Sequence, residues 1–210
     1  MILASASRAR RKLLDQVGFD YKVLASDIDE SRYSYPNVVE LVGNLAEEKA
    51  KAIVGKLLST QLKEDFSNVN LVLGCDSLFE FNGKIFGKAK DPKELIDRWR
   101  EMSGSSGTLH TGHCLFIKSS TKGKDRLGWG NYFLKDVIST QIKFSALKDK
   151  DIIRYVKSGE PMECAGGFAL DGKGGIFIDE INGCYSNVIG LSLPWLKKAL
   201  EKCGLLDELI

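Results

Sequence analysis

A mostly apolar run at residues 69–79, followed at once by a hairpin signal, constrains the fold more than any other feature of the chain. A run of this length and composition is typical of a buried strand. Asn82 and Gly83 then form a dipeptide that two-residue hairpins prefer, and residues 84–86 would supply the returning strand. The sequence therefore predicts a buried strand with at least one antiparallel partner.

Helical patterns alternate with strand patterns along the rest of the chain. Apolar residues recur at helical spacing between Asn37 and Leu58, and Asp91 with Pro92 suits the start of a second helix. We expect further strands at residues 2–4, 109–117, 137–144 and 175–181, and further helices between Ser7 and Gly18, at residues 149–157 and after Ser192. Residues 119–131 are expected as an exposed loop. This interleaving predicts an α/β protein with a central mixed β-sheet flanked by helices.

Composition limits the classes of protein that remain. A chain of 210 residues with 43% hydrophobic and 28% charged residues fits one globular domain or two closely packed lobes. Its formal net charge of +2 is too small to attract nucleic acid over the whole surface. The apolar runs are strand-sized, so we expect no membrane span and no signal peptide.

Cysteine and histidine usage favours a reduced protein without a zinc site. The five cysteines are odd in number and widely spaced, which predicts free thiols in the cytoplasm. His110 and His113 lie three residues apart in an expected strand, where their side chains would point to opposite faces. We therefore do not expect them to chelate one metal ion.

The junction between the first strand and the first helix is rich in hydroxyls and cations. It contains Ser5, Ser7, Arg8, Arg10, Arg11 and Lys12. Hydroxyls, free backbone N–H groups and a positive helix end suit a phosphate. The alternative is a serine cap followed by a solvated basic first turn, although basic residues there oppose the helix dipole.

Three further groups of charged residues are candidates for chemistry. Asp76 interrupts the apolar strand and, if buried, needs a cation, a metal or hydrogen-bond donors; otherwise it bonds a neighbouring turn at a strand end. Lys88 and Lys90 follow the hairpin, where they could neutralise phosphoryl charge or form an ordinary exposed turn. The acidic segment at residues 27–30 is either a solvated loop or a source of magnesium ligands. The glycine-rich residues 165–175 and residues 185–187 are expected as turns.

Taken in order, these segments resemble the Maf family of nucleoside triphosphate pyrophosphatases. The family's opening motif, L-A-S-x-S-P-R-R-x-x-L-L, is matched by Leu3, Ala4, Ser5, Ser7, Arg10, Leu13 and Leu14. Its S-D-x-D-E, A-x-x-K-A, G-A-D-T and G-K-P-x-D segments correspond to residues 26–30, 46–50, 74–77 and 87–91. Matches continue at residues 111–112, 159–161, 165–166 and 186–191, so the resemblance covers nearly the whole chain.

The resemblance implies one Maf-like domain over residues 1–210, with an α/β fold like that of the inosine-triphosphatase-type enzymes, two lobes around a cleft, and often a homodimer. It implies cleavage of nucleoside triphosphates into a monophosphate and pyrophosphate, with Asp76 as proton acceptor. Glu30 and Asp76 would hold a divalent cation, Mg²⁺ or alternatively Mn²⁺. The phosphate-binding residues would be Ser5, Ser7, Arg10, Lys49, Lys88 and Lys90.

Departures from the family pattern concern specificity. Arg8 stands where the family usually has Pro, and Ala9 where the branch acting on dTTP and UTP has Arg. Ser77 and Asp171 replace that branch's Thr and Gln. Asp171 could accept hydrogen bonds from a base, as the Glu of the 7-methyl-GTP branch could, and modified triphosphates come into question as substrates.

Two other functions remain open from the sequence. One is a nucleic-acid-binding or cell-division-regulating protein that acts through the basic residues 8–12, which would show salt-dependent binding. The other is a different phosphate-ester hydrolase, which would release orthophosphate instead of pyrophosphate.

Overall fold

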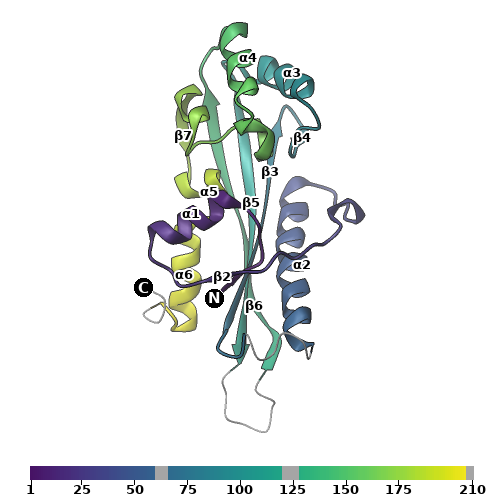
Figure 1. The fold of residues 1–210 in the computed structure, drawn as a ribbon, viewed down its shortest axis with the longest axis vertical. Coiled ribbons are helices and arrows are strands. Elements are labelled where there is room, and N and C mark those ends of the chain that lie inside the picture. Colours follow the sequence, from purple (N-terminus) through teal and green to yellow (C-terminus); the bar gives the residue numbers. More distant parts are fainter. Residues whose placement is uncertain (60–65, 120–127, 207–210) are drawn as a thin grey trace. The chain divides into compact units, whose positions relative to one another are not determined.

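A computed structural model describes residues 1–59, 66–119 and 128–206 of the protein (Figure 1). Seven strands form one sheet in the order β2-β1-β3-β5-β6-β7, with β4 paired to β3. They are β1 (Ile2–Leu3), β2 (Lys22–Val23), β3 (Leu71–Phe81), β4 (Lys84–Phe86), β5 (Ser106–Ser119), β6 (Gly128–Phe144) and β7 (Ile178–Asn182). Strand β1 pairs in parallel with β2 and β3, whereas β4 and β7 pair antiparallel with β3 and β6. The predicted mixed sheet is confirmed.

Helices of different lengths connect and flank the strands. The α-helices are α1 (Arg8–Gln16), α2 (Val38–Leu58), α3 (Pro92–Met102), α4 (Asp149–Lys157), α5 (Tyr185–Ile189) and α6 (Leu193–Cys203). Short 3-10 helices are η1 (Glu30–Arg32), η2 (Glu160–Glu163), η3 (Ala165–Gly167) and η4 (Lys173–Phe177).

In residues 1–59, 66–119 and 128–206, no helix combines the length and apolarity that a bilayer crossing needs. All five cysteines are free thiols.

The chain divides into two compact units, in keeping with the two lobes expected. The first unit comprises Met1–Asp76, Gly112–Val137 and Leu193–Ile210, and the second comprises Ser77–Thr111 and Ile138–Ser192. Strands β3, β5 and β6 contribute residues to both units. The cleft between lobes stays a prediction.

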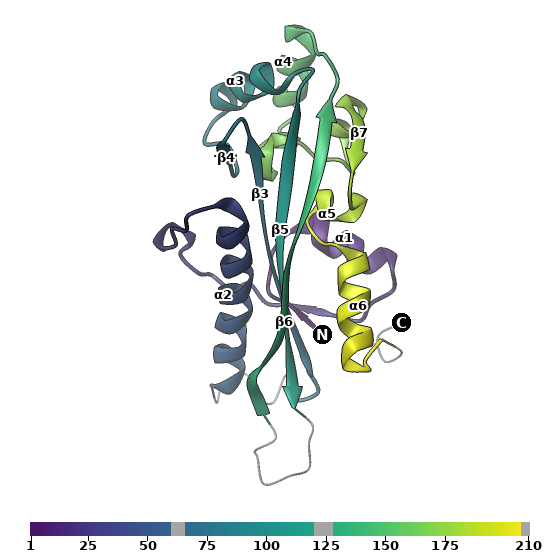
Figure 2. The ribbon, with the colours of Figure 1, turned by 180° about the vertical axis from the view of Figure 1, so that it is seen from behind.

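In the first unit, helices cover opposite faces of the strands (Figures 1 and 2). Helix α2 lies against β3 and β5 at two glycines, because a Cβ at Gly74 would lie 2.1 Å from the carbonyl oxygen of Ala46 and one at Gly112 would lie 2.0 Å from that of Val42. On the other face, Trp195 of α6 stacks near His113, with ring centroids 4.8 Å apart. The glycine that interrupts the apolar run of β3 is therefore needed for close helix packing.

The second unit has an aromatic core. Phe79, Trp99, Phe144 and Phe168 meet in edge-to-face contacts with centroids 5.1 to 5.8 Å apart. The indole N–H of Trp99 donates to the carbonyl oxygen of Gly167 at 2.8 Å, which satisfies its one polar atom inside this core. Helices α3 and α4 pack over these rings and support the loops that follow α4.

Several predicted signals have the expected geometry. Asn82 and Gly83 both adopt positive φ, at 48° and 71°, as a type I′ hairpin turn requires. The side chain of Asp91 accepts the backbone N–H of Glu94, so the predicted cap is confirmed. Asn37 accepts the backbone N–H of Glu40 in the same way at the start of α2. The expected strand residue His110 lies in β5, and its Nδ1 is 2.8 Å from Ser139 Oγ.

Three sequence predictions were wrong in detail. Residue 119 belongs to β5 and residues 128–131 belong to β6 instead of the loop, because a strand continues past the local Gly and Asn residues that indicated a loop. Residues 120–127 of that predicted loop lie outside the described residues. Residues 175–177 form part of η4, and β7 begins only at Ile178. Residues 185–187 begin α5 instead of a turn, and this helix ends at Gly190, whose φ is +117°.

Candidate active site

The centre of the candidate site is an ion-paired cluster in the first unit. Asp76 projects from β3 and is only 6% exposed. Its Oδ1 lies 2.5 Å from the Nζ of Lys49, which also lies 2.7 Å from Oε1 of Glu30. Lys49 reaches this position because α2 approaches β3 closely at Gly74, where the next helix residue, Ala50, is in contact. One ammonium group therefore holds two carboxylates.

Burial and neighbouring charges act in opposite directions on the carboxyl of Asp76. Burial raises its pKa and the charge of Glu30 raises it further, whereas Lys49 and Arg10 lower it, and the net direction is upward. A carboxylate whose pKa is raised towards neutrality is a better proton acceptor than an ordinary surface aspartate. Burial also raises the pKa of the adjacent Cys75 thiol to about 11, so Cys75 stays protonated near neutral pH.

The segment that begins α1 contributes a second group of polar contacts. Ser5 Oγ accepts hydrogen bonds from Arg10 Nη1 at 2.9 Å and from the backbone N–H of Ser7 at 3.3 Å. Ser7 Oγ accepts the backbone N–H of Arg10, so the helix cap weighed as the alternative is present. Arg10 is 8% exposed and lowers the pKa of Asp76, which brings its charge to the same cluster. Phosphate binding by these residues stays a prediction.

The acidic segment before α2 separates into residues with different partners. Asp27 pairs with Lys56 at 3.0 Å, and Asp29 accepts hydrogen bonds from Ser31 and Arg32 of its own short helix. Only Glu30 joins Lys49. Sequence reasoning could not separate the three carboxylates, because the partners of Asp27 and Glu30 lie on α2, more than fifteen residues further along the chain.

The two carboxylates around Lys49 suit a hard divalent cation. Among the residues that the structure describes, no group of three or more His, Cys, Asp or Glu side chains converges as metal ligands. Glu30 and Asp76 nevertheless share one ammonium, so their oxygens converge on one cationic position. Magnesium is usually held by one or two carboxylates together with substrate phosphates. The types of ligand present therefore fit the predicted ion, while the position between the two carboxylates is filled by the Lys49 ammonium.

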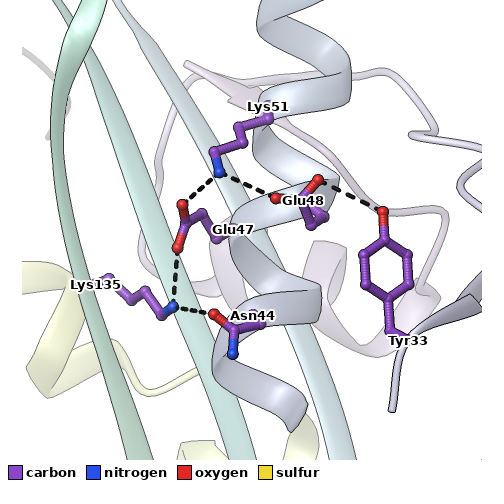
Figure 3. A network of polar contacts seen from close by, with 6 residues as sticks. All are labelled: Tyr33, Asn44, Glu47, Glu48, Lys51 and Lys135. Carbon is purple, nitrogen blue, oxygen red and sulfur yellow. Dashed lines mark hydrogen bonds and ion pairs between the residues drawn. The ribbon is translucent and has the colours of Figure 1, made fainter. Parts of the chain in front are cut away.

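A polar network beside this cluster ties the Glu30 segment to α2 (Figure 3). Tyr33 Oη donates to Glu48 Oε2 at 3.4 Å, and Glu48 pairs with Lys51 at 3.0 Å. Glu47 bridges Lys51 and Lys135 at 2.6 and 2.8 Å. Through Glu48, the network anchors Tyr33, which directly follows η1, to the helix that carries Lys49.

The remaining predicted site residues are Ala9, Ser77, Lys88, Lys90 and Asp171. Ala9 lies in α1 of the first unit, and the other four lie in the second unit. Ser77 Oγ is 2.9 Å from Thr111 Oγ1, and Lys88 Nζ is 3.1 Å from Glu163. The backbone N–H of Lys90 donates to Glu94. Burial raises the pKa of the Cys164 thiol, the charge of Asp171 raises it further and the charge of Lys88 lowers it, so both charges act on this thiol. Lys90 directly precedes the N-cap of α3.

Three residues of the second unit that contact predicted specificity residues or their loop were missed by sequence reasoning. Thr111 contacts Ser77, and Tyr155 with Glu160 contacts the loop that carries Asp171. The family match at residues 159–161 and 111–112 included Glu160 and Thr111, but it did not indicate what either residue does. Tyr155 had no signal beyond an apolar helical pattern.

Comparison with known proteins identifies the family to which the chain belongs. A protein of Prochlorococcus marinus, named nucleoside triphosphate pyrophosphatase, is 49% identical over 205 residues, covering 98% of this chain and 98% of its own length. Proteins of the same name from Synechococcus sp. (strain CC9605) and Gloeothece citriformis (strain PCC 7424) are 45% and 44% identical, covering 95% and 97% of this chain and 100% and 93% of their own lengths. The family model for Maf-like proteins matches residues 1–203. This chain belongs to the Maf-like protein family.

Proposed function

We propose that the protein is a nucleoside triphosphate pyrophosphatase, which hydrolyses its substrate to a nucleoside monophosphate and pyrophosphate. One observation carries the proposal: Asp76 is buried, its pKa is raised, and it is held by the same ammonium as Glu30. The names of the relatives support the same activity. Burying this group of charges is costly for stability alone, so a catalytic role accounts for it better than a structural role.

In the proposed reaction, Asp76 takes a proton from a water molecule that attacks the α-phosphorus. A bond forms between the water oxygen and the α-phosphorus, and the bond from that phosphorus to the bridging oxygen of the β-phosphate breaks. Pyrophosphate leaves with the bonding electron pair. The Lys49 ammonium favours the ionised form of Asp76, which is the form that accepts a proton, because it lowers the pKa of this carboxyl against the effect of burial.

Phosphate recognition falls to the predicted cationic and hydroxyl residues. Ser5, Ser7 and Arg10 lie at the start of α1, where free N–H groups and the helix dipole favour an anion. Lys88 and Lys90 would neutralise charge on the leaving pyrophosphate. A divalent ion held by Glu30 and Asp76, Mg²⁺ or alternatively Mn²⁺, would supply further neutralisation of the phosphate oxygens.

Base selection is assigned to Ala9, Ser77 and Asp171. Ala9 offers no hydrogen bond, whereas Ser77 and Asp171 carry polar groups, and a carboxylate accepts hydrogen bonds from the N–H groups of a base. Because Ser77 and Asp171 can form hydrogen bonds with groups on a base, we extend the proposal to modified or non-standard triphosphates. The homodimer and the cytoplasmic location remain predictions of the family resemblance and of the free thiols.

Nucleic-acid binding through residues 8–12 is the weaker candidate. Arg10, the central cation of this segment, is buried and donates to Ser5 instead of facing solvent. A phosphate-binding stripe needs its cations accessible to the polyanion. The geometry of Arg10 favours a small anion at the start of α1 over a polymer.

Hydrolysis in ¹⁸O-labelled water tests the proposed reaction. Attack at the α-phosphorus places the label in the monophosphate, with unlabelled pyrophosphate as the second product. Label in pyrophosphate would place the attack at the β-phosphorus, and release of orthophosphate would identify a different phosphate-ester hydrolase. Either of these results would contradict the proposal.

A further inference from the structure

The loop that carries Asp171 is tied at both ends to two side chains from α4 and η2. Tyr155 Oη accepts the backbone N–H of Ala169 at 3.0 Å and donates to Glu160 Oε1 at 3.0 Å. Glu160 in turn accepts the N–H of Lys173 on Oε2 at 3.0 Å and that of Gly174 on Oε1 at 3.1 Å. Residues 169–174 are therefore closed onto one tyrosine and one carboxylate, with Asp171 between the two ends.

Two glycines make this close approach sterically allowed. A Cβ at position 172 would lie 2.5 to 2.8 Å from the carboxylate atoms of Glu160, and one at position 174 would lie 2.4 Å from Tyr155 Oη. Contacts this short do not occur between real side chains, so a larger residue at either position would force the loop or the facing side chain to move. Gly172 and Gly174 thus belong to the same arrangement as the two polar side chains.

The two side chains are themselves firmly supported. Tyr155 is 4% exposed, and its ring packs edge to face on Trp99 and Phe177 at 5.5 and 5.3 Å. Although burial alone would raise the pKa of Glu160, the N–H groups of Lys173 and Gly174 hold it below its ordinary value. Glu160 is therefore ionised at neutral pH, with both oxygens accepting hydrogen bonds from the loop.

We propose that Tyr155 and Glu160 are positioning residues for base selection, which hold the 169–174 loop so that Asp171 presents its carboxylate at one fixed place. The ligand group recognised there is the N–H edge of a nucleobase, since an ionised carboxylate only accepts hydrogen bonds. This inference rests on the proposed function. It adds that discrimination between bases depends on residues that do not touch the base themselves.

Glu160→Gln and Tyr155→Phe test the proposal with little change of shape. A glutamine keeps one oxygen and replaces the other by an amide nitrogen, so one of the two loop N–H groups loses its acceptor. Tyr155→Phe removes the partner of the Ala169 N–H. Glu101→Gln is the matched control, because Glu101 is an exposed glutamate of the same unit, paired with Lys84 and remote from the loop in the chain.

Two measurements on the full-length protein separate the loop from the chemistry. Amide hydrogen exchange at residues 169–174 reports whether the loop is held. Steady-state kinetics with several nucleoside triphosphates report kcat and KM for each base. We expect faster amide exchange at residues 169–174 in Glu160→Gln and Tyr155→Phe. We also expect the ratio of kcat/KM for the best base to kcat/KM for the worst base to fall by roughly three- to tenfold. The loss should appear mainly in KM for the preferred base, with kcat largely retained and Glu101→Gln unchanged.

Each contrary result has a distinct meaning. Unchanged exchange in both variants would overturn the assigned contacts. Faster exchange with an unchanged base ratio would overturn the positioning role and leave the pyrophosphatase proposal intact. Absence of pyrophosphate release by the unmodified protein would overturn the proposed function, and the role in base selection with it.

Discussion

Lys49 and Asp76 form a buried ion pair, with the ammonium nitrogen 2.5 Å from Oδ1 of the carboxylate and side chains only 12% and 8% exposed. The two residues are 27 positions apart and come from different elements, α2 and β3. Attraction in a buried pair offsets the desolvation of both charges only while both partners are present. The pair therefore links the stability of the fold to the group proposed to accept the proton.

Lys49→Met should lower the free energy of unfolding by about 3 kcal/mol at pH 7, because it leaves the Asp76 carboxylate buried without its main cation. Urea unfolding measures this loss. In the double variant with Asp76→Asn the loss should shrink, since no charge remains to be compensated. Glu30→Gln is the control: Glu30 is 55% exposed, so its pair with Lys49 contributes less than about 1 kcal/mol. Additive losses in the double variant would contradict a buried pair.

Gly74→Ala and Gly55→Ala should have opposite effects on stability. At position 74 the new methyl group would lie 2.1 Å from the Ala46 carbonyl oxygen, so α2 must move away from β3 at a cost of roughly 2 kcal/mol or more. At position 55, within α2, nothing lies within 4 Å, and alanine should stabilise the helix by about 1 kcal/mol. Thermal unfolding of both variants measures whether one is destabilised and the other stabilised relative to the unmodified protein. Equal effects would show that α2 does not approach β3 as described.

Removal of divalent ions should abolish hydrolysis, and Mg²⁺ or Mn²⁺ should restore it. Glu30→Gln should raise the Mg²⁺ concentration needed for half-maximal activity by at least about tenfold, because a carboxylate ligand is lost. Asp29→Asn is the matched control, since Asp29 is the neighbouring acid but bonds only within its own short helix. Binding of Mn²⁺, followed by its paramagnetic resonance, gives a second readout. Identical metal requirements in the two variants would remove Glu30 from the metal site.

Glu160→Gln should destabilise the protein at neutral pH but not at low pH. The folded-state pKa of Glu160 is lowered, so the stability it contributes is present above the unfolded-state pKa of about 4.3 and is lost as pH falls through the folded value. We expect a deficit of about 1 kcal/mol at pH 7 that shrinks as pH falls below about 4.3 and vanishes below the lowered folded-state pKa. Thermal unfolding of both proteins across this range checks the sign. A deficit that grows on acidification would contradict the depressed pKa.

Local signals in the sequence were sufficient for most of the elements. Asp91 predicted a helix start because a side-chain cap depends only on neighbouring backbone groups, and the hairpin turn depends only on Asn82 and Gly83. The start of β7 was wrong because η4 is held by Glu160, a residue more than ten positions away. Tertiary contacts of this kind leave no trace in local periodicity.

The candidate site was predictable in part for the same reason. Asp76 could be singled out because a carboxylate in an apolar strand needs a partner, but that partner could not be named from the strand alone. Lys49 entered through the family resemblance, and the short distance to Asp76 depends on the close approach of α2 at Gly74. The role of Glu160 could be found only from the structure. Its carboxylate oxygens accept backbone N–H groups, and nearly every residue type carries such a group, so the sequence gives no signal for these partners.

Product analysis of the unmodified protein and of Asp76→Asn, with Mg²⁺ and a panel of nucleoside triphosphates, tests the central claim most directly. The account predicts equimolar monophosphate and pyrophosphate from the unmodified protein. In the variant, whose side chain is nearly the same size but accepts no proton, release should fall by at least about a hundredfold. Circular dichroism and thermal unfolding of the variant would show that the fold is retained. Near-normal pyrophosphate release by a folded Asp76→Asn protein would contradict the assignment of Asp76 as the proton acceptor.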